Sequence, residues 1–123
     1  MAQIFIQASN VGKPGPAGPA GGAPPLVSTQ QSGTTYTLVA GDSGTVVEFT
    51  NASAVTVTVP PSVFSTGQVV EIFQYGAGQV TLSPGSGVTL RSDASRVKTA
   101  GQYATIGLRC RASNEFVVSG DVA

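Results

Sequence analysis

Apolar and polar side chains alternate most regularly at residues 54–59, where valine and threonine take turns from residue 55 onward. Successive side chains of a β-strand point to opposite faces, so this pattern predicts a strand with one buried and one solvent-facing side. Residues 46–50 follow the same rule, with Glu48 on the polar face. Two prolines at residues 60–61 end the longer run, because proline cannot donate to a β-ladder.

Short runs of this kind continue to the end of the chain, separated by turns rich in glycine, proline, serine and asparagine. They cover residues 36–39, 46–50, 54–59, 68–75, 79–82, 88–90, 103–110 and 115–119. No helical apolar stripe is present, so the pattern predicts an all-β domain over residues 26–123, an antiparallel β-sandwich or barrel of the jelly-roll type. Two hairpins are expected, across Gly-Ala-Gly at residues 76–78 and across residues 111–114.

Glycine recurs at every third position of residues 12–21, as in a collagen triple helix, where only glycine fits the crowded axis. So short a run cannot hold three chains together, because ordering the backbone costs roughly 1–2 kcal/mol per residue. The run therefore predicts either a threefold assembly held by the body that follows or a stiff Gly/Pro linker. We treat residues 12–25 as a spacer, whose candidate contacts between chains are Gly12, Gly15, Pro16, Gly18, Pro19 and Gly21.

Residues 1–11 form a short arm in which Ile4, Phe5 and Ile6 stand between two glutamines. An apolar β-prone segment at a chain end is a liability unless another strand pairs with it. We expect the arm to add to the edge of a sheet on another protein, with these three residues as its contacts. The alternative is that it folds back onto its own body as an edge strand.

The chain of 123 residues carries 6 basic and 6 acidic residues, for a net charge of zero. This balance excludes the basic face that a nucleic-acid-binding protein needs. Charged residues make up 10% of the chain, against about 25% in ordinary soluble domains. Either an assembly covers much of the surface, or the surface is neutral and rich in Ser, Thr, Gln and Asn. No secretory signal and no apolar stretch of about 20 residues is present, so we expect assembly in the cytoplasm without a membrane partner.

Several catalytic chemistries lack their residues in this chain, which has no histidine, no tryptophan and one cysteine. A Ser-His-Asp or Cys-His site is impossible, and so is a zinc site built from Cys and His. Cys110 is expected to be a small buried core residue. Glu48 and Glu71 could lie on neighbouring strands, but both occupy polar positions and are interpreted as solvated. We expect no enzymatic activity, no cofactor and no metal.

Basic residues gather in the last third of the chain and allow two interpretations. They are Arg91, Arg96, Lys98, Arg109 and Arg111. Together they could form a weak basic patch that meets an acidic partner surface. Alternatively, they are ordinary solubilising charges at turns and strand edges.

Four segments resemble a β-domain of structural proteins in tailed phages: residues 70–81, 87–92, 101–105 and 116–121. Such domains occur at the ends of tail-fibre and head-fibre proteins and in small capsid decoration proteins, often downstream of collagen-like triplets. The resemblance covers about residues 33–123 and carries no catalytic motif. It implies a homotrimer, in agreement with the glycine triplets.

The arrangement of arm, spacer and one β-domain favours a decoration, or cement, protein on the outer capsid surface of the virion. Such a protein would bind the major capsid protein through its arm as a homotrimer and stabilise the shell. The alternative is a head-fibre or tail-fibre tip that binds a host receptor or glycan. That tip would use the loops at residues 76–78 and 91–99, with Tyr75 and Tyr103 as aromatic platforms. A polysaccharide depolymerase fragment is a third possibility, although such enzymes are normally much longer.

Overall fold

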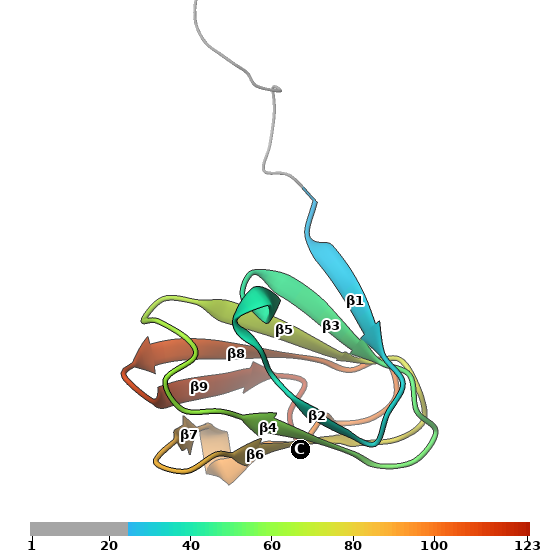
Figure 1. The fold of residues 1–123 in the computed structure, drawn as a ribbon. Helices are drawn as coiled ribbons and strands as arrows, with labels where there is room; N and C mark the ends of the chain where they lie inside the picture. Colours follow the sequence, from blue (N-terminus) through green and yellow to red (C-terminus); the bar gives the residue numbers. More distant parts are fainter. Residues whose placement is uncertain (1–24) are drawn as a thin grey trace, which may run out of the picture.

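The computed structural model describes residues 25–123, which fold into two β-sheets (Figure 1). The described strands are β1 (Val27–Gln31), β2 (Thr35–Thr37), β3 (Thr45–Phe49), β4 (Val55–Val59), β5 (Val69–Gln74), β6 (Val80–Pro84), β7 (Thr89–Arg91), β8 (Thr105–Ala112) and β9 (Glu115–Gly120). Two short 3-10 helices, η1 (Ala40–Asp42) and η2 (Asp93–Ser95), lie between strands. The larger sheet has the order β1-β3-β5-β8-β9-β7, and the smaller has the order β2-β4-β6.

From β1 to β6 the chain winds like a solenoid, because consecutive strands belong alternately to the two sheets. β1, β3 and β5 are parallel neighbours in the larger sheet, and β2, β4 and β6 are parallel neighbours in the smaller one. Each turn of the winding therefore contributes one strand to each sheet. We call these turns the first, second and third coil, containing β1 and β2, β3 and β4, and β5 and β6.

The expectation of an all-β domain is confirmed, but the antiparallel sandwich or barrel is wrong. Of the seven strand pairings in residues 25–123, five are parallel. The antiparallel pairs are β5 with β8 and β8 with β9. The hairpin expected across residues 111–114 is this β8–β9 pair, with Asn114 in the left-handed region at its turn. The arrangement is β-solenoid-like, extended at one side by the hairpin.

The hairpin expected across residues 76–78 is also wrong, because this segment turns a corner between sheets. β5 ends in the larger sheet and β6 begins in the smaller one. The corner packs directly on the second coil: the Gly78 N–H donates to the Asn51 carbonyl oxygen at 3.0 Å. A Cβ atom added to Gly78 would overlap the Ser53 carbonyl oxygen, and one added to Gly76 would overlap the backbone at Thr50 and Asn51. Glycine permits this close approach of one coil to the next.

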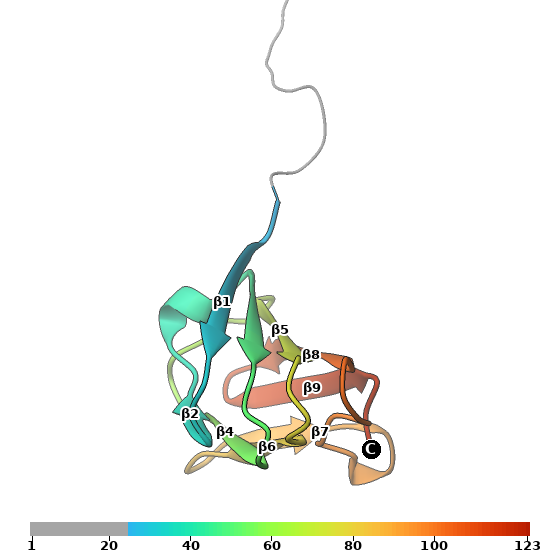
Figure 2. The same ribbon diagram turned by 90° about the vertical axis from the view of Figure 1, so that its right-hand side faces the viewer.

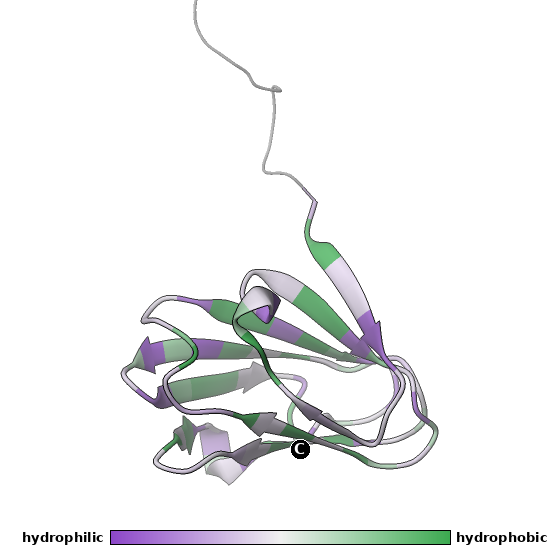
Figure 3. Ribbon diagram, in the orientation of Figure 1, coloured by the Kyte–Doolittle hydropathy of each residue, from purple (hydrophilic) through white to green (hydrophobic). Residues whose placement is uncertain are grey.

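The hydrophobic core lies between the two sheets and follows the alternation seen in the sequence (Figure 3). The valines of β4 are buried, and so are Val47 and Phe49 of β3. Cys110 is buried in the same cluster, as expected. Two buried polar side chains, Gln74 and Thr99, satisfy each other: the Thr99 hydroxyl donates to the Gln74 side-chain oxygen and accepts the Val80 N–H at 2.9 Å.

The first coil lies at the end of the solenoid and is much less buried than the coils behind it (Figure 2). β1 and β2 are the edge strands of their sheets, so each has a strand neighbour on one side only within the described chain. Leu26 is 60% exposed and Val27 is 63% exposed. The chain enters the solenoid at this point, immediately after the spacer.

Candidate functional site

Three aromatic side chains form a partly exposed group at the end of β5. The rings of Tyr75 and Tyr103 meet edge to face, with centroids 6.0 Å apart and planes 67° apart. The ring of Phe73 also lies near Tyr75, at a centroid distance of 6.3 Å. Tyr75 is 52% exposed and Tyr103 is 62% exposed. We refer to Phe73, Tyr75 and Tyr103 as the aromatic cluster.

Hydrogen bonds fasten the loop that carries Tyr103 to the end of β5. The Tyr103 N–H donates to the Gln74 carbonyl oxygen at 2.6 Å, and the Gln74 N–H donates to the Ala104 carbonyl oxygen at 3.0 Å. The side-chain amide of Gln102 donates to the Tyr75 carbonyl oxygen at 3.1 Å. Tyr103 has φ of +70°, which is unusual for a bulky residue. The tyrosines, far apart in the sequence, are thus brought together by backbone contacts.

A shallow hollow of about 600 Å³ lies beside the cluster. Its lining includes Gln102, Tyr103 and Asp121, together with small residues of the same two segments. Asp121 is exposed, and its Oδ2 accepts the Thr105 N–H at 3.4 Å. A second hollow of about 480 Å³ shares Gly120 and Val122 with the first, so the two are adjacent. Volumes of this size are typical of small-molecule sites.

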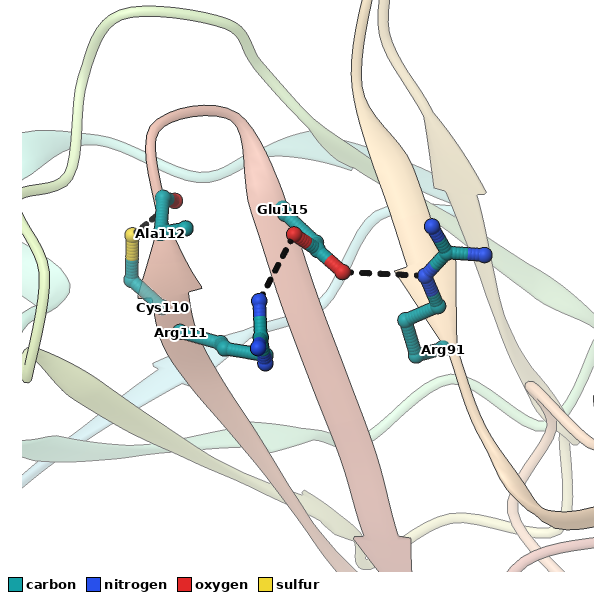
Figure 4. Close-up of polar contacts among 5 residues, drawn as sticks. All are labelled: Arg91, Cys110, Arg111, Ala112 and Glu115. Atoms are coloured by element: carbon teal, nitrogen blue, oxygen red, sulfur yellow. Dashed lines mark hydrogen bonds and ion pairs between the residues drawn. The ribbon is translucent and has the colours of Figure 1, made fainter.

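Three of the five residues of the expected basic patch pair with carboxylates of the same chain, whereas Lys98 and Arg109 form no ion pair within residues 25–123. Arg91 Nε lies 3.0 Å from Glu115 Oε2, and Arg111 Nη1 lies 3.0 Å from Glu115 Oε1 (Figure 4). Arg96 pairs with Asp93 at 3.1 Å. The hydrogen bond from Arg91, reinforced by the nearby charge of Arg111, lowers the pKa of the Glu115 carboxyl. These ion pairs favour the interpretation as ordinary surface charge.

The remaining chemical candidates do not assemble into a site. Glu48 and Glu71 lie on neighbouring strands, but the register sets Glu71 beside Val46 and Glu48 beside Phe73. Burial raises the pKa of the Cys110 thiol, which lies 3.3 Å from the Ala112 carbonyl oxygen (Figure 4). A raised pKa disfavours the reactive thiolate. Within residues 25–123 no group of three or more Cys, Asp and Glu side chains is close enough to hold a metal ion.

The expected contacts of the arm and spacer lie outside the described residues. They are Ile4, Phe5 and Ile6 of the arm and Gly12, Gly15, Pro16, Gly18, Pro19 and Gly21 of the spacer. The described chain begins beside these segments, at the exposed Leu26 and Val27. The sequence indicated Tyr75 and Tyr103 together, as aromatic platforms of a receptor-binding tip. It missed Gln102 and Asp121, because exposed polar residues in turns carry no distinguishing pattern.

The chain matches no protein-family model, no curated protein and no solved structure in the comparisons made. Among residues 25–123 there is no helix long and apolar enough to span a bilayer.

Proposed function

We propose that this chain is a structural protein of a tailed-phage virion, a decoration protein that binds the outer capsid surface as a homotrimer. The observation that supports the proposal is the construction of β1. This edge strand contains no charged residue, and the apolar Leu26 and Val27 at its start are exposed. Edge strands of proteins that stay unpaired are usually short, charged or covered. β1 therefore has the features of an edge that meets another chain.

The opposite edge of the same sheet is protected in the usual way. β7 has three residues and carries Arg91, which is tied to Glu115 of β9. A charged, short edge discourages pairing with other chains. The contrast supports the proposal that chains associate at the β1 edge, the end that the glycine triplets of the sequence precede.

In this proposal the spacer and the first coil bring three chains together, and the three arms bind the major capsid protein. Linking three weak contacts through one trimer raises the effective concentration of each arm. Binding to the assembled shell stabilises that shell by mass action. Ile4, Phe5 and Ile6 are the proposed capsid contacts.

Two measurements test the proposal. Light scattering on the full chain is expected to give the mass of a trimer; a monomer would contradict the threefold assembly. Sedimentation with capsid shells that lack the protein is expected to show binding by the full chain. The triple variant Ile4→Ser, Phe5→Ser, Ile6→Ser should lose it, while the matched variant Gln3→Ser, Gln7→Ser should keep it. Shell binding by the triple variant would overturn the role of the arm, and no binding by the full chain would overturn the decoration function.

A further inference from the structure

We propose that the aromatic cluster and the hollow beside it form a binding site for a neutral oligosaccharide. The site lies at the end of β5 and along the loop that precedes β8. The described chain begins just before β1, and β1 runs parallel to β5 through β3, so the site and the start of the described chain lie at opposite ends of these strands (Figure 1). The inference does not depend on the proposed decoration function.

The exposed rings are the first argument. Tyr75 and Tyr103 are both more than half exposed, and they touch each other. Single exposed apolar residues are ordinary, but contiguous patches mark interaction sites. The face of an aromatic ring is electron-rich and attracts the polarised C–H groups on one face of a pyranose ring. Tyrosine adds a hydroxyl group that can donate to or accept from a sugar hydroxyl.

The polar groups around the rings favour a neutral sugar over an anion. The first hollow is lined by the Asp121 carboxylate and the Gln102 amide, and no Lys or Arg occurs among its described lining residues. A phosphate, sulfate or uronate would therefore meet a negative charge without a compensating cation. A carboxylate accepts hydrogen bonds from several hydroxyl groups, and an amide both donates and accepts. Sugar hydroxyls match this set.

The backbone of Tyr103 is the second argument. A non-glycine residue in the left-handed region costs of order 1–3 kcal/mol and persists where the surroundings enforce it. The hydrogen bond from the Tyr103 N–H to Gln74 holds this conformation, and the resulting turn presents the ring to solvent beside Tyr75. The chain thus maintains a strained backbone while the side chain of Tyr103 remains exposed. A backbone that is fixed before binding reduces the entropy that a ligand must offset.

The adjacent second hollow indicates a ligand longer than one sugar ring. Its lining includes Arg91, which is paired with Glu115, and Asp93, which is paired with Arg96, and it joins the first hollow at Gly120 and Val122. Because the two hollows share Gly120 and Val122, an oligosaccharide bound in the first can continue into the second.

The test uses the full chain and a panel of hexasaccharides. The neutral probes are maltohexaose, cellohexaose, mannohexaose and hexa-N-acetylchitohexaose, and the acidic probe is hexagalacturonate. Two-dimensional NMR titration of the labelled protein is expected to give saturable shifts at Tyr75, Gln102, Tyr103 and Asp121 with at least one neutral probe. The expected Kd is below about 1 mM. Binding of the acidic probe alone, or of none of the five, would overturn the proposal.

Tyr103→Gly is the decisive variant, because glycine adopts the same left-handed backbone without strain. It removes the ring and leaves the turn, so the melting temperature should not fall, while affinity for the neutral probe should drop at least tenfold. Tyr103→Phe should keep most of the affinity, and Val39→Ser, at an exposed apolar residue of the first coil, serves as the control. Unchanged affinity in Tyr103→Gly would overturn the role of the ring. A marked fall in its melting temperature would show that the ring is structural.

Discussion

The two ends of the larger sheet are built from the same kind of strand but differ in what surrounds them. At the β1 end, Thr29 lies in register with Val47 of β3, which lies in register with Ile72 of β5 and then Ile106 of β8. Val47, Ile72 and Ile106 are fully buried, whereas Thr29 on the same row is exposed. At the other end, β7 is short and held by a charged contact. Along this row the three positions with a strand on both sides are buried, and the position on the edge strand β1 is exposed.

The largest effect is expected from substitutions along this row. Ile72→Ala leaves a cavity in the centre of the core and should lower the free energy of unfolding by about 2–5 kcal/mol. Thr29→Ala removes an exposed side chain and should change it by less than about 0.5 kcal/mol. Urea unfolding followed by circular dichroism measures both.

A large fall in the free energy of unfolding of Thr29→Ala would contradict this difference between Thr29 and Ile72. It would mean that the first coil is covered in solution, which is the expected behaviour if the copies of the chain associate there. Repeating the urea unfolding over a range of protein concentrations distinguishes an associated chain from a monomer, because the stability of an associated form depends on concentration.

The alternation of side chains predicted which faces are buried, but it did not predict the direction of strand pairing. Parallel and antiparallel strands have the same side-chain period of two. The valines of residues 55–59 are buried as expected in either arrangement. Direction is decided by the connections: residues 32–44 form a crossover that contains β2, and such crossovers return the chain parallel to itself. The corner at residues 76–78 resembled a hairpin turn because both use glycine.

The sequence indicated the two tyrosines of the candidate site, but it did not predict that their side chains are in contact. Tyr75 and Tyr103 are visible in the sequence as aromatic residues beside turns. Their contact depends on the hydrogen bond between Tyr103 and Gln74, and on the antiparallel pairing of β5 with β8. Both are long-range features that a local pattern does not encode. The pairing of Arg91 with Glu115, which also binds Arg111, likewise depends on β7 lying beside β9.

Tyr36 of β2 anchors the first coil, and its removal should have an intermediate effect. Its hydroxyl donates to Asp42 Oδ2 at 2.8 Å, and its ring meets Phe49 of the second coil at 5.9 Å between centroids. Tyr36→Phe removes the hydrogen bond to a charged group and should cost about 1–3 kcal/mol. Hydrogen exchange should accelerate at β1 and β2 and not at β5 or β8. Equal acceleration in all four strands would contradict a separate, weaker first coil.

Ionisation of the same tyrosine is expected to lower the stability of the fold at alkaline pH. Burial, the hydrogen bond to Asp42 and the charge of Asp42 together raise the pKa of Tyr36 to about 12. The folded state therefore retains this proton at pH values where the unfolded chain has lost it, so its contribution to stability is complete below about pH 10 and declines between about pH 10 and 12. Denaturation midpoints across this range should fall less steeply in Tyr36→Phe than in the unaltered chain. An identical slope in both proteins would contradict the raised pKa.

The smallest effect is expected at the opposite end of the sheet, from Glu115→Gln. Glu115 links Arg91 on the edge strand β7 to Arg111 on β8, but both arginines are exposed and the ion pairs are open to water. Surface ion pairs of this kind contribute little to stability and weaken further in salt.

The contribution of Glu115 also depends on pH. The hydrogen bond from Arg91 lowers the pKa of the Glu115 carboxyl in the folded state, so its contribution to stability is present at neutral pH and is lost as the pH falls through that lowered pKa. The urea midpoints of variant and parent should therefore differ slightly at pH 7 in low salt and converge in acid or in 1 M salt. A shift of the urea midpoint larger than that caused by Tyr36→Phe would contradict this ranking. It would mean that the Glu115 carboxylate stabilises the β7 edge more than the Tyr36 hydroxyl stabilises the first coil.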